Sequence, residues 1–351
     1  MALPSEESSL TRVLALVALV LITIVGCGST PPAATPAPQA SSSGASAAFP
    51  VTLPHKYGDT TIPAAPERVV TVGLLEQDSL LALGIVPVGT TEWFGEYPGA
   101  IGPWAEAKLG GAARPQVLKD TGSGPQFEKI AALNPDLILA LYSGLTKEQY
   151  ETLSKIAPTV AQPKEYIDYG IPWQEVTKRV GTAVGKAAEA ESLVKQVEDR
   201  FAEERAKHPE FAGQTGLMAT LYEGYFIFGS QDPRNRLLGS LGFQLPANLD
   251  QAIGDKFGAN ISRERLDLLD TGVIVWSVTD VAKGEETLHG DTVYKALDVV
   301  KQGREVYLPE GTPPSDAVAF LTVLSLPYVL DTLVPRLAAA VDGDPATKTT
   351  S

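Results

Sequence analysis

The chain has 351 residues, a formal charge of −14 and a pI of about 4.7. Nucleic-acid binding needs a basic surface, so this composition argues against nucleic acid as a partner. The charge also disfavours a strongly anionic ligand unless a local group of cations overrides it. With only one cysteine, the chain cannot form an internal disulfide, and its fold must be held by packing.

The N-terminal residues are typical of an export signal that ends in a lipidation site. Residues 13–25 form an apolar run that is shorter than the roughly 20 residues of a membrane span. Cys27 follows a small residue in a context that resembles a bacterial lipobox. We expect residues 1–26 to be a signal peptide and residues 27–50 to be a lipidated flexible tether. The alternative is a plain membrane anchor, since two glutamates stand where a signal peptide is basic.

Strands and helices alternate in the next part of the chain. The residue pattern predicts strands at 68–72, 86–90 and 137–140, and helices at 77–83, 127–133 and 146–156. Continuous apolar strands that alternate with helices indicate a parallel sheet covered on both faces. We therefore predict an N-terminal α/β lobe over residues 51–171.

The pattern changes between residues 172 and 209. Apolar residues recur at steps of three or four as far as Phe201, without a strong helix breaker. We predict one inter-lobe helix over residues 172–209, roughly 54 Å long. A rod of this length is better suited to joining two lobes than to covering one sheet. The alternative is two helices broken near Gly185, because glycine weakens a helix.

Strand and helix patterns then resume in a C-terminal α/β lobe over residues 210–342, before a flexible tail at residues 343–351. The predicted strands are 216–222, 225–228, 273–276 and 305–308, and the predicted helices are 236–241, 263–269, 292–300 and 315–341. We expect Pro327 and Pro335 to kink or divide the last helix. The predicted fold class is therefore α/β, with two lobes that each hold a mostly parallel sheet flanked by helices, joined by one long inter-lobe helix.

Residues 263–275 repeat the pattern of residues 127–139 without a gap. Each copy has a glutamate, a cation, an apolar residue, a leucine, a polar turn and then three apolar residues. The two lobes are therefore expected to share a helix-strand unit related by pseudo-symmetry. Glu128 and Glu264 hold equivalent places in the copies and could be paired docking points for a partner. The alternative is local, because a glutamate in the first turn of a helix also complements the helix dipole.

The loops after parallel strands meet the ligand in open α/β folds. Aromatic faces supply contact area and arginines supply forked hydrogen-bond donors. Core packing is the alternative for each of the aromatic residues, above all for Tyr222 and Trp276, and a solvated helix face is the alternative for Arg236. The predicted ligand-binding residues are Trp93, Tyr142, Tyr222, Tyr225, Arg234, Arg236 and Trp276.

The sequence shows no pattern typical of catalysis or of metal binding. It has no Gly-x-Ser-x-Gly elbow, and its three histidines belong to no cluster with metal-ligand spacing. We therefore predict no enzyme activity, no cofactor and no metal site.

Several motifs together resemble one family. Over about residues 50–341 the chain is similar to iron-siderophore ABC-transporter substrate-binding lipoproteins, of the helical-backbone class that includes haem and cobalamin binders. The motifs are the lipobox and tether, the long helix, Glu67-Arg68-Val69-Val70, Leu83-Gly84-Ile85-Val86-Pro87-Val88-Gly89, Phe127-Glu128-Lys129-Ile130 with Asn134-Pro135-Asp136, Leu241-Gly242-Phe243, and Ser262-Arg263-Glu264-Arg265-Leu266.

The resemblance implies that a ferric siderophore is held between the lobes, so ferric iron enters only as the chelate. It implies that Glu128 and Glu264 dock with an ABC transporter permease dimer. It also implies a monomer attached by lipid to the extracytoplasmic face of the cell membrane. The alternatives are a haem- or cobalamin-binding lipoprotein of the same fold, in which Tyr225 could ligate haem iron, and a binding or sensor lipoprotein without a transport role.

Overall fold

The computed structural model describes residues 49–92, 95–119, 124–254, 256–344, 346–347 and 349. Cys27, Trp93, the predicted signal peptide and nearly all of the tether lie outside the described residues, so their roles stay predictions. The fold belongs to the compact unit Ser43–Ser351. Within the described part of the chain, no helix combines the length and the apolar content needed to cross a bilayer.

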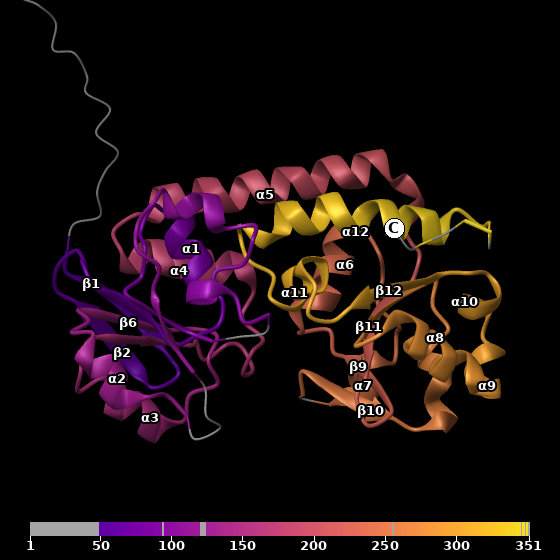
Figure 1. Cartoon of the computed structure of the whole chain (residues 1–351), viewed down its shortest axis with the longest axis horizontal. Coiled ribbons are helices and arrows are strands. Elements are labelled where there is room, and N and C mark those ends of the chain that lie inside the picture. Colours follow the sequence, from indigo (N-terminus) through magenta and orange to yellow (C-terminus); the bar gives the residue numbers. More distant parts are fainter. Residues whose placement is uncertain are drawn as a thin grey trace, which may run out of the picture. The chain divides into compact units, whose positions relative to one another are not determined.

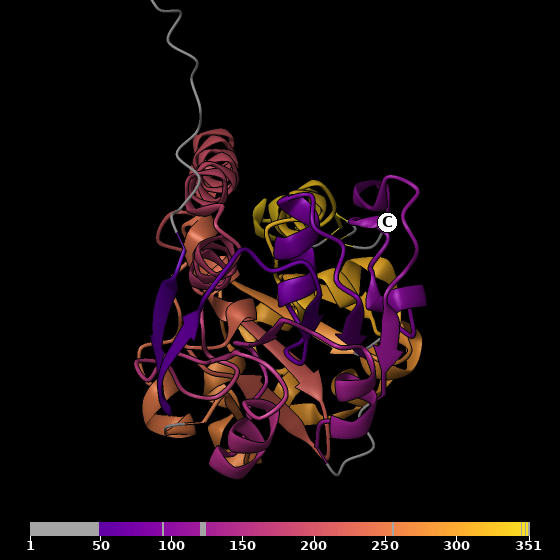
Figure 2. The same ribbon diagram turned by 90° about the vertical axis from the view of Figure 1, so that its left-hand side faces the viewer.

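The first lobe is built on a parallel five-stranded sheet with the order β5-β4-β3-β6-β7. An antiparallel hairpin precedes this sheet and is drawn in indigo in Figures 1 and 2. The strands are β1 (Val51–His55), β2 (Gly58–Ile62), β3 (Val69–Thr71), β4 (Gly89–Thr91), β5 (Gln116–Leu118), β6 (Leu137–Ala140) and β7 (Thr159–Ala161).

Helices cover both faces of this sheet, as predicted. Successive strand residues point to opposite faces, so Leu139 packs in one core while its neighbour Ile138 packs in another. The first core includes Leu80, and the second includes Ile130. The helices of this lobe are α1 (Glu76–Ala82), η1 (Pro98–Ala100), η2 (Glu106–Leu109), α2 (Phe127–Ala132), α3 (Lys147–Leu153) and α4 (Trp173–Ala183).

The prediction of one helix over residues 172–209 is wrong. The segment forms two helices, α4 and α5 (Ala187–Lys207), separated at Gly185, whose φ is 74°. Glycine adopts this left-handed conformation at little cost. A Cβ atom at Gly181 would lie 2.3 Å from the Cβ of Ala190, so the two helices pack closely against each other. The alternative of a break near Gly185 is the one that the structure confirms.

The 21-residue helix α5 is the helix that joins the lobes. Near its N-terminus Ala190 packs in the core of the first lobe. Further along, Val194, Val197 and Phe201 pack in the core of the second lobe. One apolar stripe at helical spacing therefore serves both lobes. Figures 1 and 2 show α5 beside α12 (Ser325–Val341), and Arg200 and Asp331 form an ion pair of 2.9 Å between them.

The second lobe holds a mixed five-stranded sheet with the order β10-β9-β8-β11-β12, in which β9 alone runs against its neighbours. The positions match the first sheet, since β6 and β11 both stand fourth. The predicted repeat is thus confirmed, although the second copy begins with a 3-10 helix, η4 (Arg263–Leu269). The strands are β8 (Gly216–Leu221), β9 (Tyr225–Phe228), β10 (Gly258–Ile261), β11 (Val273–Val278) and β12 (Glu305–Pro309).

Helices cover both faces of this sheet as well. One core contains Leu238 and Leu330, and the opposite core contains Leu266 and Leu288. The long C-terminal helix predicted for residues 315–341 is divided before Ser325, and Pro335 lies inside α12. The remaining helices are η3 (Pro209–Phe211), α6 (Pro233–Leu241), α7 (Leu249–Ile253), α8 (Val281–Gly290), α9 (Thr292–Lys295), α10 (Asp298–Lys301) and α11 (Pro313–Ala319).

A buried carboxylate joins the first lobe to the segment between α11 and α12. Oδ2 of Asp78 accepts a hydrogen bond of 2.8 Å from the Trp104 indole and another from the Thr322 hydroxyl. Asp78 is only 2% exposed. Burial raises its pKa from 3.8 to about 6, although both hydrogen bonds act in the opposite direction.

We predict that Asp78→Asn removes a pH dependence of stability. The raised pKa means that the folded protein binds the proton more tightly than the unfolded chain, so the free energy of unfolding falls as pH rises from about 4 to about 6. An asparagine keeps the acceptor oxygen without the buried charge. In urea unfolding, the variant should be more stable than the wild type at pH 7, by up to about 3 kcal/mol. Its free energy of unfolding should also change less between pH 4 and 6. A variant that keeps the wild-type slope would contradict this assignment.

Candidate functional site

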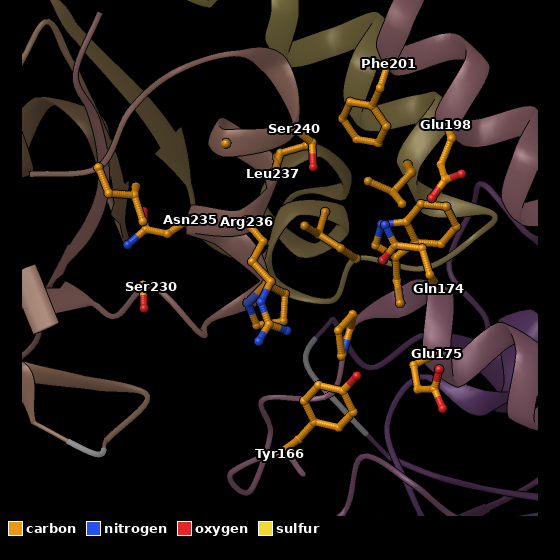
Figure 3. A pocket seen from close by; sticks show the side chains of 17 residues that line it. Tyr166, Gln174, Glu175, Glu198, Phe201, Ser230, Asn235, Arg236, Leu237 and Ser240 are labelled. Atoms are coloured by element: carbon orange, nitrogen blue, oxygen red, sulfur yellow. The ribbon is translucent and has the colours of Figure 1, made fainter. Parts of the chain in front are cut away.

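Two cavities mark the region between and beside the lobes. The larger has a volume of about 650 Å³ and is lined from both lobes, by residues such as Tyr166 and Trp173 on one side and Arg236 on the other. Figure 3 shows Arg236 extending toward Tyr166, with Phe201 of α5 on the far side of the cavity. The smaller cavity has a volume of about 210 Å³ and lies at the carboxyl edge of the first sheet. The larger volume is typical of small-molecule sites.

The loop after β6 is fixed by a buried carboxylate. The side chain of Glu76 is fully buried and accepts hydrogen bonds from the backbone N–H groups of Leu75, Leu141 and Tyr142. Burial raises the pKa of Glu76, whereas these bonds lower it. β3 and β6 are neighbours in the sheet. The strand that follows β3 lies on one side of this pair, and the strand that follows β6 lies on the other. Ligands of open α/β sheets bind beside the carboxyl ends of such a pair. Glu76 therefore holds the backbone of Tyr142 at the carboxyl end of β6.

Tyr142 is buried in the first lobe, within electrostatic range of charged residues of the second lobe. Its ring contacts the Tyr169 ring edge-on, with centroids 5.3 Å apart. Burial raises the pKa of Tyr142, the Asp232 carboxylate raises it further, and the charges of Arg234 and Arg236 lower it. These three charged residues belong to the second lobe. We call the five residues of this cluster the inter-lobe site; Tyr169 lines the smaller cavity and Arg236 lines the larger one.

Asp232 begins α6 and holds Arg234. Its Oδ1 accepts a 2.9 Å hydrogen bond from the backbone N–H of Arg234, and Pro233 occupies the first helical position. This arrangement satisfies an N–H group that the helix leaves unpaired. The Arg234 guanidinium pairs with the same carboxylate at 2.8 Å and lies 4.2 Å above the Phe228 ring.

Arg236 forms a direct hydrogen bond across the lobes. Its Nη1 donates to the carbonyl of Gly170 at 2.5 Å. Burial lowers the pKa of Arg236, and the neighbouring Tyr166 and Asp232 oppose that change. A guanidinium stays charged throughout the physiological pH range, so Arg236 places a positive charge in the lining of the larger cavity.

Aromatic side chains continue from Arg234 toward solvent. Phe226 contacts the rings of Phe228, Phe257 and Tyr222, with centroids 5.4, 5.8 and 6.4 Å apart. Tyr222 is 61% exposed and Phe257 is 45% exposed. We call these four residues the aromatic ridge. Large aromatic surfaces that remain exposed in this way mark interaction sites.

Trp276 belongs to the core, and Tyr225 is half-buried against the same core. Trp276 is fully buried, and its indole donates to the Tyr294 hydroxyl at 2.8 Å. Tyr225 packs on the same two rings and donates to Asp291 at 3.0 Å. The burial of Trp276 contradicts the prediction that it contacts a ligand, whereas for Tyr225 that contact stays a prediction. Trp276 lies in β11, which has strands on both sides, and Tyr225 points to the face of β9 opposite Phe226.

The other predicted residues differ in how a ligand could reach them. Arg236 lines the larger cavity, Arg234 is half-buried beside it in the inter-lobe site, and Tyr222 is exposed in the aromatic ridge. Tyr142 is only 4% exposed and packs in the core of the first lobe, so its contact with a ligand stays a prediction. Sequence reasoning did not select Asp232, Tyr169, Phe226, Phe228 or Phe257. The alternation along β9 could have separated Phe226 from Tyr225, and the Asp-Pro pair could have identified the N-cap of α6.

The two predicted docking glutamates are exposed, Glu128 in the first turn of α2 and Glu264 in the first turn of η4. Neither residue belongs to the inter-lobe site. Among the described residues, no group of three or more His, Cys, Asp or Glu side chains could hold a metal ion.

Known proteins resemble this chain in sequence and in architecture. The family model described as periplasmic binding protein matches residues 69–312, and the chain belongs to that family. A putative ABC transporter substrate-binding lipoprotein of Bacillus subtilis (strain 168) is 29% identical over 270 residues, which cover 72% of this chain and 79% of the relative. The Fe(3+) dicitrate-binding periplasmic protein of Escherichia coli (strain K12) is 30% identical over 201 residues, which cover 57% of this chain and 64% of the relative.

Two solved structures extend the likeness. A periplasmic solute binding protein from Mycobacterium smegmatis has 36% sequence identity and a TM-score of 0.72, covering 83% of this chain and 98% of the other. PiaA of Streptococcus pneumoniae TIGR4, in complex with ferrichrome, has 32% identity and a TM-score of 0.74, covering 84% of this chain and 99% of the other. The two-lobed α/β fold is therefore shared with substrate-binding proteins.

We predict that Gly73→Ala disturbs the loop that carries Tyr142. A Cβ atom at Gly73 would lie 2.0 Å from Oε1 of Glu76, so the carboxylate would have to leave its backbone donors. We expect a loss of about 1–3 kcal/mol in the free energy of unfolding, measured in urea. The matched control is Gly290→Ala in α8, where a Cβ atom meets nothing within 4 Å, and its effect should stay within about 0.5 kcal/mol. Equal stability of the two variants would refute the role given to Glu76.

Proposed function

We propose that this protein captures a ferric siderophore between its two lobes and delivers it to an ABC transporter permease. The observation that carries the proposal is the inter-lobe site, whose Arg236 lines a cavity of about 650 Å³ together with Tyr166 of the first lobe. The aromatic ridge beside it offers apolar surface for a bulky chelate.

The names of similar proteins support this choice of ligand. They include proteins that bind Fe(3+) dicitrate and iron(3+)-hydroxamate and a structure that contains ferrichrome. Iron would arrive already chelated, so the protein needs no resident cofactor and no ligands of its own for the metal. Because the family consists of binding proteins, we propose a carrier without catalytic activity.

The proposed setting is the extracytoplasmic face of the cell membrane, with the chain attached as a monomer through lipid on Cys27. Glu128 and Glu264 would contact basic sockets on the two halves of a permease dimer. Their equivalent positions in the repeated helix-strand unit support this pairing, since a two-fold partner presents two similar surfaces.

Ligand capture can be measured by tryptophan fluorescence, because Trp173 lines the larger cavity. We expect saturable one-to-one quenching by at least one ferric siderophore in a panel that also contains haem and cobalamin. Phe226→Ala should weaken that binding about tenfold, since it removes the centre of the aromatic ridge. Tyr225→Phe is the matched control and should bind normally, because its hydroxyl faces Asp291. Saturation by haem or cobalamin with no response to any siderophore would reject the proposed ligand.

Delivery can be separated from capture by charge reversal. We predict that Glu128→Lys with Glu264→Lys abolishes uptake of the chelate by cells and leaves its dissociation constant unchanged, because both residues lie outside the inter-lobe site. Glu151→Lys with Glu286→Lys, at exposed positions on α3 and α8, changes the net charge equally and is the matched control. Normal uptake by the double variant would remove the docking role and favour a binding or sensor protein.

A further inference from the structure

Of three cations near the two cavities, two already have a carboxylate partner. Arg234 is paired with the buried carboxylate of Asp232 at 2.8 Å. Lys119, which lines the smaller cavity, is paired with Glu92 at 3.1 Å. Arg236 donates to the Gly170 carbonyl, a neutral partner, so it alone keeps an uncompensated positive charge among these three. The arginines therefore add less positive charge than their number suggests.

Carboxylates at the carboxyl edge of the second sheet have hydroxyl partners instead of cations. Glu310 follows β12 and accepts hydrogen bonds from Thr220, Ser277 and Thr279 at 3.1–3.3 Å. These hydroxyls come from the ends of β8 and β11, the edge where ligands meet an α/β sheet. Glu310 is exposed, and no ion pair reaches it from the described residues.

A second such carboxylate lies nearby. Asp316 accepts a 2.8 Å hydrogen bond from the Tyr97 hydroxyl of the first lobe, and it feels the charge of Glu310. No described cation forms an ion pair with it either. Glu310 and Asp316 carry two carboxyl groups against the single uncompensated charge of Arg236, so these three residues together supply no net positive charge.

We infer that this protein selects ferric chelates without net negative charge, of the trihydroxamate class, and that Asp232 sets this preference by neutralising Arg234. The inference rests on the proposed function and specifies its ligand. Three hydroxamates balance the charge of Fe³⁺, so the chelate is neutral and can place its apolar exterior on the aromatic ridge. A polyanionic citrate or catecholate chelate would instead meet Glu310 and Asp316 with only Arg236 to offset them.

Titrations with four probes test the selectivity. Ferrichrome is neutral, ferrioxamine B carries one ammonium group, and ferric dicitrate and a ferric tricatecholate are polyanions. We expect both trihydroxamates to bind at least about tenfold more tightly than either polyanion. Tight binding of a polyanion, equal to or stronger than that of the hydroxamates, would overturn this inference and leave the proposed function standing. Failure of all four to bind would overturn the proposed function itself, and the selectivity with it.

Substitution at Asp232 tests the residue assignment. Asp232→Asn keeps an oxygen that can cap α6 and removes the charge that neutralises Arg234. The ratio of ferric dicitrate affinity to ferrichrome affinity should rise about tenfold. Glu310→Gln, which retains an acceptor for the three hydroxyls, should move the ratio in the same direction. Glu310 lies outside α6, so Glu310→Gln still tests the effect of local charge on selectivity if Asp232→Asn folds poorly.

Glu151→Gln is the matched control, since it changes the net charge equally on the exposed face of α3. Its affinity ratio should equal that of the wild type. A ratio that is the same in Asp232→Asn, Glu310→Gln and Glu151→Gln would show that the local charges do not determine the selectivity.

Discussion

The arrangement of the site depends on one helix that packs in two cores. Ala190 of α5 lies in the core of the first lobe, and Val194, Val197 and Phe201 lie in the core of the second. Rotating or shifting one lobe about α5 would therefore expose apolar surface in at least one core, at about 25 cal/mol for each Å². The larger cavity lies against this helix, since Phe201 and Glu198 line it. The same contact that holds the lobes together thus sets the distance across which a ligand must be bound.

Two buried carboxylates, one in each lobe, then fix the residues that face each other beneath α5. Glu76 holds the loop of Tyr142 through backbone N–H groups, and Asp232 caps α6 and pairs with Arg234. Burying a carboxylate is costly unless donors surround it, and burial raises the pKa of both groups. In both lobes the buried carboxylate fixes the position of another group, a loop in the first lobe and an arginine in the second. Each carboxylate thus positions a residue of the inter-lobe site, Tyr142 in the first lobe and Arg234 in the second.

The alternation of strands and helices predicted the two sheets, because burial on both faces of a sheet leaves a clear pattern of apolar runs. Periodicity could not find the break at Gly185, since the apolar spacing of α4 continues into α5 and only the φ of 74° distinguishes a turn from a helical glycine. Residue type selected Arg234, Arg236 and Tyr142, which the structure brings close together, and their contact with a ligand stays a prediction. It failed for Trp276, which is buried because β11 is paired on both sides and Tyr294 packs against the indole. Pairing of Asp232 with Arg234 could have been suspected from the Asp-Pro N-cap, but its position opposite Tyr142 required the tertiary structure.

The two lobes differ at the place where the ligand is proposed to bind. In the first sheet the chain leaves β3 through α1 before it reaches β4, and all strands run parallel. In the second sheet β8 turns directly into the antiparallel β9, through Glu223 and Gly224 with φ angles of 54° and 130°. This hairpin creates the aromatic ridge and brings the chain into α6 with its N-terminal Asp232 and Arg234. The parts that match between lobes, α2 with β6 and η4 with β11, carry the proposed docking glutamates. The proposed two-fold permease would contact what the lobes have in common, whereas the proposed chelate would contact what distinguishes them.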